Sequence, residues 1–276
     1  MKENIGVTDK WNALVVGTGS SAIGKTIAEV LSEDFSVIKT SKNDGDTEKL
    51  DITSVDSIKS FVSKCLKENK KPLETIFLNS GVMNRGNTIN RSNFYRRSNN
   101  GDPSINTHLY NVVLLERLQQ AGLITPETKV IYNASVQIFE WKKGYEDYAY
   151  MKNLVSNLIL NDNHRNPTIL CASLIEGTTM AEKFKDMLNR KKENWFQEFV
   201  FKNMPYGQPS LDDINNAVTL ILADKEGTRW KFVFVDGGSV ENNKKILIDN
   251  DFLFYDKKTN TLRSPAFYNF LAQPTQ

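Results

Sequence analysis

Three side chains near the middle of the chain have the types and spacing that proton transfer requires. Tyr148 and Lys152 are four residues apart in a segment with helical periodicity, which places them close together on one face of a helix. A phenol ordinarily has a pKa of about 10, but an adjacent ammonium group favours the phenolate and brings that pKa toward the working range. Ser135, at the end of the preceding predicted strand, could donate a hydrogen bond to a substrate carbonyl oxygen. The pattern predicts acid–base chemistry at a carbonyl group, and the alternative for the Tyr–Lys pair is an ordinary surface pair on a helix.

A glycine-rich turn follows the first apolar segment of the chain. Small residues in such a turn let the backbone approach a pyrophosphate, and the free N–H groups of the following helix point at it. The alternative is a tight strand-to-helix turn that binds nothing. Its position in the first βα unit favours the nucleotide interpretation. The residues of the turn that we expect to contact a nucleotide are Gly17, Thr18, Gly19, Ser20, Ser21, Ile23 and Gly24.

The residues after the second predicted strand bear on which nucleotide is bound. An acidic residue there suits a ribose 2′-hydroxyl, whereas a cation suits a 2′-phosphate. The sequence reads Lys39, Thr40, Ser41, Lys42, with no carboxylate before Asp44. We therefore expect Ser41 and Lys42 to contact the cofactor, and NADP to be favoured over NAD, which stays possible. The alternative for Lys42 is a solvated loop residue.

The elements that must position these residues follow from the hydrophobic pattern. Short apolar segments alternate with segments of helical period, which is typical of βαβ units and a parallel sheet. Strands are expected at 13–16, 35–40, 50–52, 75–78, 129–132, 168–172 and 230–235. Helices are expected at 23–31, 54–69, 145–160 and 211–223. A further helix is expected to follow a loop at 82–104 and to run to about residue 120. The prediction is an α/β protein with a doubly wound parallel sheet (Rossmann fold) of about seven strands and helices on both faces.

The same pattern predicts the domain organisation. Residues 1–240 are expected to form the Rossmann domain, and 241–276 a C-terminal extension that packs on the domain or on a neighbouring subunit. The apolar segments 245–248 and 252–255 in this extension are interpreted as strands or as apolar anchors.

Composition excludes several other classes of protein. The chain has 276 residues and a net charge of +2, which gives no electrostatic case for a nucleic-acid partner. Two histidines, His108 and His164, cannot form a three-histidine zinc site, and Cys65 and Cys171 do not form a CxxC pair. With no signal peptide and no membrane-spanning segment apparent, we expect a cytoplasmic protein without a metal site.

Taken in order, these motifs resemble those of the short-chain dehydrogenase/reductase family over residues 11 to about 240. The turn from Gly17 to Gly24 is similar to the family's TGxxxGxG motif, although Thr18 and Ala22 stand where the family has glycine. Ser135, Tyr148 and Lys152 fall at the family's catalytic spacing. Further similar motifs are Leu50, Asp51 and Ile52 at the adenine site; Asn79, Ser80 and Gly81; Asn106 in the following helix; Thr178 near the cofactor carboxamide; and Asp236, Gly237 and Gly238 after the last strand.

The resemblance implies a mechanism. Tyr148 would exchange a proton with the substrate oxygen while the nicotinamide delivers or accepts hydride, and Ser135 would orient the carbonyl group. Lys152 would lower the pKa of Tyr148 and hold the nicotinamide ribose, and Asn106 would keep a water behind Lys152. The leading interpretation is an NADP-dependent carbonyl reductase or alcohol dehydrogenase, in a homodimer or homotetramer. The alternatives are an epimerase or dehydratase of the same fold, and a catalytically idle NADP-binding regulatory protein.

Two regions bear on the substrate. Residues 181–206 occupy the place of the family's substrate lid, and their aromatic residues either line an apolar pocket or form the buried side of an amphipathic helix. Basic residues in this region and near the site could attract an anionic substrate or an acyl group on an acidic carrier protein, or simply be solvated surface. They are Lys183, Lys185, Arg190, Lys191 and Lys192, with Arg85, Arg91, Arg96 and Arg97. In place of the family's Pro-Gly after the sixth strand the chain has Ser173 and Leu174.

Overall fold

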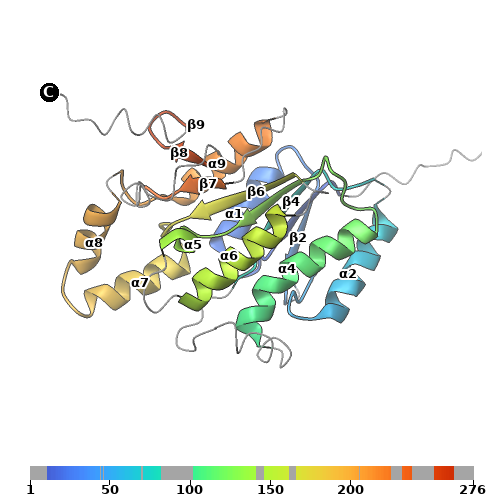
Figure 1. Cartoon of the computed structure of the whole chain (residues 1–276), viewed down its shortest axis with the longest axis horizontal. Coiled ribbons are helices and arrows are strands. Elements are labelled where there is room, and N and C mark those ends of the chain that lie inside the picture. The colour runs from blue at the N-terminus through green and yellow to red at the C-terminus, as the bar shows by residue number, and fades with distance from the viewer. Residues whose placement is uncertain are drawn as a thin grey trace, which may run out of the picture.

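The computed structural model describes residues 11–43, 45, 47–69, 71–81, 102–140, 146–161, 166–204, 206–224, 232–237 and 252–263. These residues form one sheet with the strand order β3-β2-β1-β4-β5-β6-β7-β8-β9 (Figure 1). Strands β1 to β8 run parallel to their neighbours, and β9 is antiparallel to β8.

The strands are short and mostly buried. Their bounds are β1 (Ala13–Val16), β2 (Val37–Ser41), β3 (Glu48–Lys49), β4 (Thr75–Leu78), β5 (Lys129–Asn133), β6 (Asn166–Ala172), β7 (Phe232–Val235), β8 (Phe252–Asp256) and β9 (Thr261–Arg263). The helices are α1 (Ala22–Leu31), α2 (Val55–Glu68), α4 (Pro103–Gln120), α5 (Gln137–Glu140), α6 (Glu146–Leu160), α7 (Thr179–Asn189), α8 (Trp195–Asn203) and α9 (Leu211–Ala223).

Helices cover both faces of the sheet because successive side chains of each strand point to opposite faces. On β1, Leu14 belongs to a core that includes residues of α2, α4 and α6, whereas its neighbour Val15 belongs to a core that includes residues of α1 and α9. Figure 1 shows α2, α4 and α6 together on one side of the sheet. The predicted doubly wound parallel sheet is therefore confirmed.

Most of the predicted elements occur where the sequence pattern put them. The strand at 75–78 and the helix at 211–223 have the predicted bounds, and the helix predicted at 54–69 runs from Val55 to Glu68. Its first turn is capped by Ser54, whose hydroxyl accepts a hydrogen bond from the backbone N–H of Ser57 at 3.2 Å. Strand β6 begins at Asn166, two residues before the predicted strand, and the helix α5 was not predicted.

The third strand differs from the prediction at 50–52. Strand β3 consists of Glu48 and Lys49, which pair with the end of β2. An edge strand made of polar residues cannot be recognised by a run of apolar residues. The strand was therefore predicted at the apolar residues Leu50 and Ile52, which follow β3 in the chain. Their side chains are buried in the core beneath α2.

The described part of the C-terminal extension continues the sheet. The apolar segment predicted at 252–255 is a strand, β8, which pairs with β7 in parallel, and β9 returns beside it (Figure 1). The segment 245–248 lies outside the described residues. In the portion of the chain that the structure describes, no helix combines the length and the apolarity needed to cross a membrane.

Candidate active site

A cavity opens at the carboxyl ends of the central strands. Strand β1 pairs with β2 on one side and β4 on the other, so the chain direction across the sheet reverses here. Ligands of open α/β sheets bind at such a switch point. The cavity has a volume of about 820 Å³ and is lined by the turn after β1, the end of β2, residues 50–53 and residues 79–81.

The turn after β1 requires glycine at three positions. Gly17 has a φ of +83°, a conformation that favours glycine. A Cβ on Gly24 would lie 2.4 Å from the carbonyl oxygen of Gly17, and one on Gly19 would lie 2.7 Å from the Cβ of Ser41. Thr18, in contrast, is buried, and its hydroxyl and backbone N–H both donate to the carbonyl of Thr40, at 3.1 and 2.9 Å. The threonine is thus held by β2 and does not project from the turn.

The turn leads directly into the N-terminus of α1. The hydroxyl of Ser21 caps this helix by accepting a hydrogen bond from the backbone N–H of Gly24 at 3.2 Å. The N–H groups of Ala22 and Ile23 belong to the first turn, which has no acceptors within the helix. Together with the positive end of the helix dipole they form an anion site. Bare backbone, unused donors and a cavity of this size fit the pyrophosphate and the adenosine half of a dinucleotide.

Charged residues at the far side of the cavity are paired. The Lys42 ammonium lies 3.0 Å from Asp51 Oδ2, and the Lys42 side chain is 69% exposed. Thr53 donates two hydrogen bonds to the same carboxylate, from its backbone N–H at 2.9 Å and from its hydroxyl at 2.6 Å. Burial raises the pKa of Asp51, but the hydrogen bonds from Thr53 and Lys42 outweigh this effect and hold that pKa below its ordinary value. The Ser41 hydroxyl is bonded to the hydroxyl of Thr47 at 2.7 Å.

The three residues proposed for proton transfer come together beside this cavity. Helix α6 carries Tyr148 and Lys152 on one face, and Ser135 follows β5; all three side chains are buried. Ser135 and Tyr148 form a hydrogen bond. The Lys152 ammonium lies 5.9 Å from the centre of the Tyr148 ring and 4.7 Å above the ring of Tyr132. The spacing in the sequence thus corresponds to proximity in space.

The electrostatics of this group differ from the expectation that Lys152 lowers the pKa of Tyr148. Burial raises the pKa of Tyr148 to about 12, and the hydrogen bond to Ser135 opposes it only in part. Burial also lowers the pKa of Lys152 to about 7. The reason is that the dry site penalises both charged forms, so near neutral pH much of the lysine has lost the charge that would favour a phenolate.

A series of side-chain amides, which we call the amide chain, connects Lys152 to the glycine turn. Lys152 donates to the carbonyl of Asn133 at 2.5 Å, and the Asn133 amide donates to Asn79 Oδ1 at 2.7 Å. The Asn79 amide in turn donates to the Ser21 hydroxyl at 2.7 Å and to the Gly17 carbonyl at 3.2 Å. Lys152 and the glycine turn are therefore parts of one hydrogen-bonded structure.

Comparison with known proteins gives the fold a name. No protein-family model and no curated protein matches the sequence. A short chain dehydrogenase family protein from Francisella tularensis subsp. tularensis SCHU S4 is similar in structure, with a TM-score of 0.64 at 19% identity over 84% of this chain and 99% of that one. The ligand-free aldohexose dehydrogenase of Thermoplasma acidophilum has a TM-score of 0.67 at 18% identity, over 85% and 95% of the two chains. A gluconate 5-dehydrogenase from Burkholderia cenocepacia J2315, in complex with NADP and tartrate, has a TM-score of 0.64 at 18% identity, over 85% and 96%. The chain has the short-chain dehydrogenase fold.

Two residues assigned from the short-chain dehydrogenase motifs, Asn106 and Thr178, are not among those that line the cavity described above. Asn106 is buried in the first turns of α4, and its Oδ1 accepts no hydrogen bond from the residues that the structure describes. The hydroxyl of Thr178 caps α7: it accepts from the N–H of Ala181 at 3.2 Å and donates to the carbonyl of Ile175 at 2.7 Å. Asp236 is buried after β7, and Gly237 has a φ of +62°, while Gly238 lies outside the described residues.

Sequence reasoning missed two residues of the site in this short-chain dehydrogenase fold. Asn133 connects Lys152 to Asn79, and the Tyr132 ring lies against the Lys152 ammonium. Both are buried polar side chains at the carboxyl end of β5. Polar residues at that end of an otherwise apolar parallel strand were the available signal.

The region expected to be a substrate lid consists of α7 and α8. Phe184 on α7 meets the rings of Phe196 and Phe199 on α8 edge-on, with ring centres 6.4 and 5.1 Å apart. Phe196 is buried between the helices, whereas Phe201 is 88% exposed. Part of the aromatic set therefore joins the two helices, as the amphipathic interpretation expects, and part is left on the surface.

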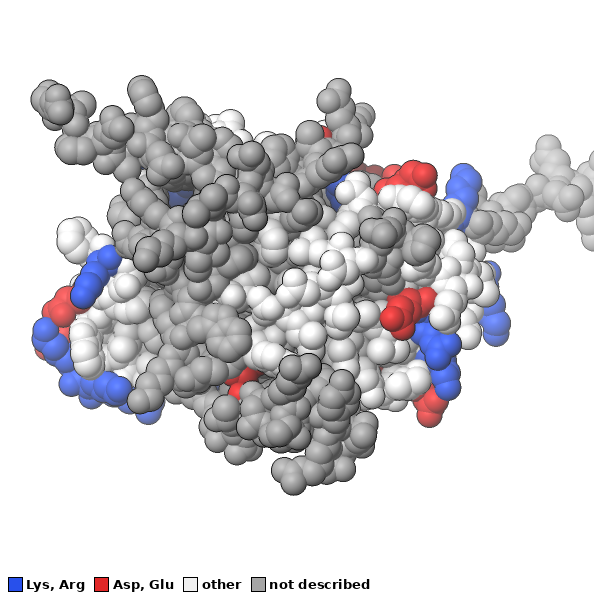
Figure 2. All heavy atoms as spheres, viewed as in Figure 1, with Lys and Arg blue, Asp and Glu red and all other residues white. Residues whose placement is uncertain are grey.

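Several basic residues lie on α7 and α8 and in the segment between them. Figure 2 shows Lys and Arg side chains gathered at the end of the molecule where α7 and α8 lie. Some are paired, with Lys192 2.9 Å from Glu198 and Lys185 3.9 Å from Glu182. The expected arginine cluster of Arg85, Arg91, Arg96 and Arg97 lies outside the described residues.

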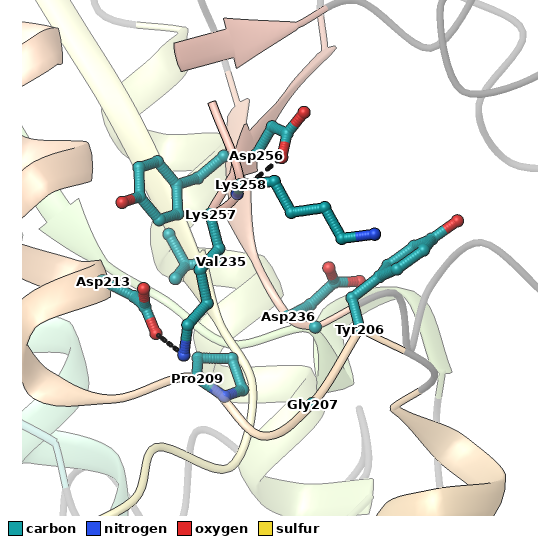
Figure 3. A pocket seen from close by; sticks show the side chains of 11 residues that line it. Tyr206, Gly207, Pro209, Asp213, Val235, Asp236, Asp256, Lys257 and Lys258 are labelled. Carbon is teal, nitrogen blue, oxygen red and sulfur yellow. Dashed lines mark hydrogen bonds and ion pairs between the residues drawn. The ribbon is translucent and has the colours of Figure 1, made fainter. Parts of the chain in front are cut away.

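A second, small cavity of about 90 Å³ lies between β7, the β8–β9 hairpin and the start of α9 (Figure 3). Two of its charged residues, Lys257 and Asp213, form an ion pair. Lys257 points toward Asp213 and approaches its Oδ2 to 3.1 Å (Figure 3). Asp213 also forms the capping box of α9 with Ser210. The contact fastens the hairpin to the domain.

Proposed function

We propose that this chain is an NADP-dependent oxidoreductase of the short-chain dehydrogenase/reductase family, a carbonyl reductase or alcohol dehydrogenase. The observation that carries the proposal is the buried group of Ser135, Tyr148 and Lys152, joined by the amide chain to a glycine turn that fits a pyrophosphate. The fold likeness to dehydrogenases supports it. The substrate is a small carbonyl or alcohol compound, or one bound to a carrier protein, a possibility that the basic residues of α7 favour.

The residues have separate roles in the proposed reaction. The pKa of Tyr148, raised to about 12, keeps the phenol protonated at neutral pH, so it serves as the acid that protonates the substrate oxygen during reduction. The Ser135 hydroxyl, already bonded to Tyr148, positions the same oxygen. Lys152 supplies positive charge near the phenolate that forms. Asn106 stays a predicted water-holding residue behind Lys152.

The cofactor supplies the hydride when it is bound. The residues proposed to hold it are Gly17, Thr18, Gly19, Ser20, Ser21, Ile23, Gly24, Ser41, Lys42, Asp51, Ile52, Asn79, Ser80, Gly81, Tyr148, Lys152 and Thr178. Three lysines line the cavity, Lys25, Lys39 and Lys42, which supports NADP over NAD because a 2′-phosphate adds negative charge. The Burkholderia gluconate dehydrogenase of the same fold holds NADP.

Nucleotide binding and turnover test the proposal in sequence. Thermal unfolding with saturating NADPH should show a larger stabilisation than with NADH, and no stabilisation by either would refute it, since a ligand of the native state must stabilise that state. With benzaldehyde, 2,3-butanedione and ethyl acetoacetate as carbonyl probes, oxidation of NADPH should be detectable at 340 nm. Tyr148→Phe should lower kcat by about a hundredfold or more while nucleotide binding is kept.

Tyr150→Phe is the matched control, since it removes a hydroxyl from the same helix two residues away. Its kcat should stay close to that of the wild type. Nucleotide binding combined with turnover that leaves NADPH absorbance unchanged would favour an epimerase or dehydratase. Binding with biological activity indifferent to Tyr148→Phe would favour a regulatory protein. We also propose that the protein is a cytoplasmic homodimer or homotetramer, which light scattering of the purified protein and fractionation of cells test.

A further inference from the structure

His108 is a fully buried residue of α4 that the proposed mechanism does not use. Its imidazole packs edge-on against the Tyr148 ring, with ring centres 5.7 Å apart and an angle of 69° between the planes. The imidazole is therefore a titratable group that contacts the proposed acid and has no role in the proposed mechanism.

His108 and Lys152 both lie close to Gly81. A Cβ on Gly81 would lie 3.1 Å from the Lys152 Nζ and 2.8 and 3.3 Å from the Cε1 and Nδ1 of His108. The Lys152 amine and the His108 imidazole therefore border the same small space, which a side chain at position 81 would fill. Gly81 also lines the nucleotide cavity, so this shared volume lies at the junction of the cavity and the catalytic group.

The backbone around His108 is held in place. The Asn111 side-chain amide donates to the carbonyl of His108 at 2.9 Å and to the carbonyl of Ser80 at 3.3 Å. This ties one turn of α4 to the segment that ends in Gly81. The backbone at His108 is thus fixed relative to the segment that ends in Gly81.

We propose that His108 is a positioning residue for Lys152: its imidazole holds the amine beside Tyr148 and exchanges a proton with it. The step breaks an N–H bond of the imidazolium and forms an N–H bond on the neutral amine, which leaves a neutral imidazole and an ammonium, with no change of oxidation state. The restored charge stabilises the Tyr148 phenolate left after the phenol has given its proton to the substrate. The imidazole regains its proton by way of the cavity that Gly81 lines, and oxidation of an alcohol runs the steps in reverse. This inference rests on the proposed function.

Burial lowers the pKa of Lys152 to about 7, so the amine can gain or lose a proton near neutral pH. Among the described residues, the titratable side chains facing the Lys152 amine are Tyr148 on its own helix, Tyr132 on β5 and Cys171 on β6, besides His108.

Nuclear magnetic resonance of the full-length protein without nucleotide or substrate tests the contact directly. The chain has two histidines, so its imidazole Cε1–H spectrum has two signals, and His108→Asn identifies the one from His108. In Lys152→Met the titration midpoint of the His108 signal should move by about 0.5 pH units or more, because a neighbouring charge is lost. The His164 signal serves as internal reference. A His108 signal whose shift and midpoint are unchanged in Lys152→Met would overturn the inference.

Kinetics of the holoenzyme with NADPH and the carbonyl probe that the wild type reduces best give the second test. His108→Phe keeps an aromatic ring against Tyr148 but removes both nitrogens; it should lower kcat about tenfold to a hundredfold and displace the pH profile, with KM little changed. His108→Asn, which keeps hydrogen bonding but cannot titrate in this range, should displace the profile likewise. Leu109→Ala is the matched control, because it loosens the same turn of α4 and should lower stability without displacing the profile.

A His108→Phe enzyme with the kcat and pH profile of the wild type would overturn the inference. If the protein neither binds NADPH nor reduces any carbonyl probe, the proposed function fails. The magnetic resonance test needs neither ligand, so it still decides whether His108 and Lys152 are coupled, and the two failures are distinguishable.

Discussion

Replacing Lys152 by methionine should change how the stability of the protein depends on pH. Folding lowers the pKa of this lysine from 10.5 to about 7. Between these values the unfolded chain binds more protons than the folded one, so the free energy of unfolding rises with pH. The lysine destabilises the fold by about 5 kcal/mol below pH 7, and this cost disappears above about pH 10.5. Methionine has a similar shape and no charge, so Lys152→Met removes the dependence.

The assay is urea unfolding of the protein without nucleotide, followed by the fluorescence of its four tryptophans, at pH 7.5, 8.5 and 9.5. The free energy of unfolding of the wild type, relative to that of Lys152→Met, should rise by about 2 to 3 kcal/mol across this range. Lys152→Met also loses the hydrogen bond to Asn133 and the contact with Tyr132, which changes the free energy of unfolding by the same amount at every pH. The test is therefore the slope of the free-energy difference against pH.

Titration of the buried cysteines is common to both proteins and cancels in the difference to first order. Lys64→Met is the control. The ion pair with Glu48 raises the pKa of Lys64 above its ordinary value, so this lysine stays protonated in both states below pH 9.5 and the difference curve should be flat. A flat curve for Lys152→Met as well would refute the argument that a dry site sets the charge of Lys152.

Four further predictions concern the cavity and the hairpin. Gly24→Ala would bring a Cβ to 2.4 Å from the Gly17 carbonyl; it should destabilise the protein by about 1–3 kcal/mol and weaken NADPH binding, measured by thermal unfolding with and without nucleotide. Lys42→Ala should lower the affinity for NADPH about tenfold, or about 1.4 kcal/mol, and leave that for NADH nearly unchanged in fluorescence titrations; equal losses would contradict a 2′-phosphate contact. Asp51→Asn removes the ion partner of Lys42 and should favour NADPH further. Lys257→Met removes the ion pair with α9 and should increase hydrogen exchange in the β8–β9 hairpin, with the exchange of β4 unaffected.

The fold was largely predictable because its central elements obey simple patterns. The four residues of β4 are all buried and apolar or β-branched, so periodicity alone identified them. The bounds of strand β3 were not predicted, because this edge strand of two polar residues is defined only by its pairing with β2. Pairing between strands cannot be recognised from the local sequence. The helix α5 is a single turn, too short to show a period.

The candidate site was predictable in its types of residue but not in its connections. The spacing of Tyr148 and Lys152 follows from helix geometry, and both side chains lie together as expected. The contact between Lys152 and the Asn133 carbonyl joins different elements, so no sequence spacing encodes it. The raised pKa of Tyr148 likewise depends on burial by the whole fold, whereas the sequence argument considered one neighbouring charge.

The order of the strands has a consequence for how the protein is made. Strands β2 and β3 extend outward from β1 on one side, β4 is added on the other side of β1, and from β5 onward each strand lies beside the strand synthesised before it. A nascent chain leaving the ribosome can therefore enlarge its sheet one strand at a time, without inserting a late strand between two early ones. Until synthesis ends, the edge at which the sheet grows, opposite to β3, belongs to the strand made last, where another chain could pair with it. Only when the hairpin has been released does the three-residue β9 become the edge, and a ribosome that stops before Phe252 leaves β7 exposed.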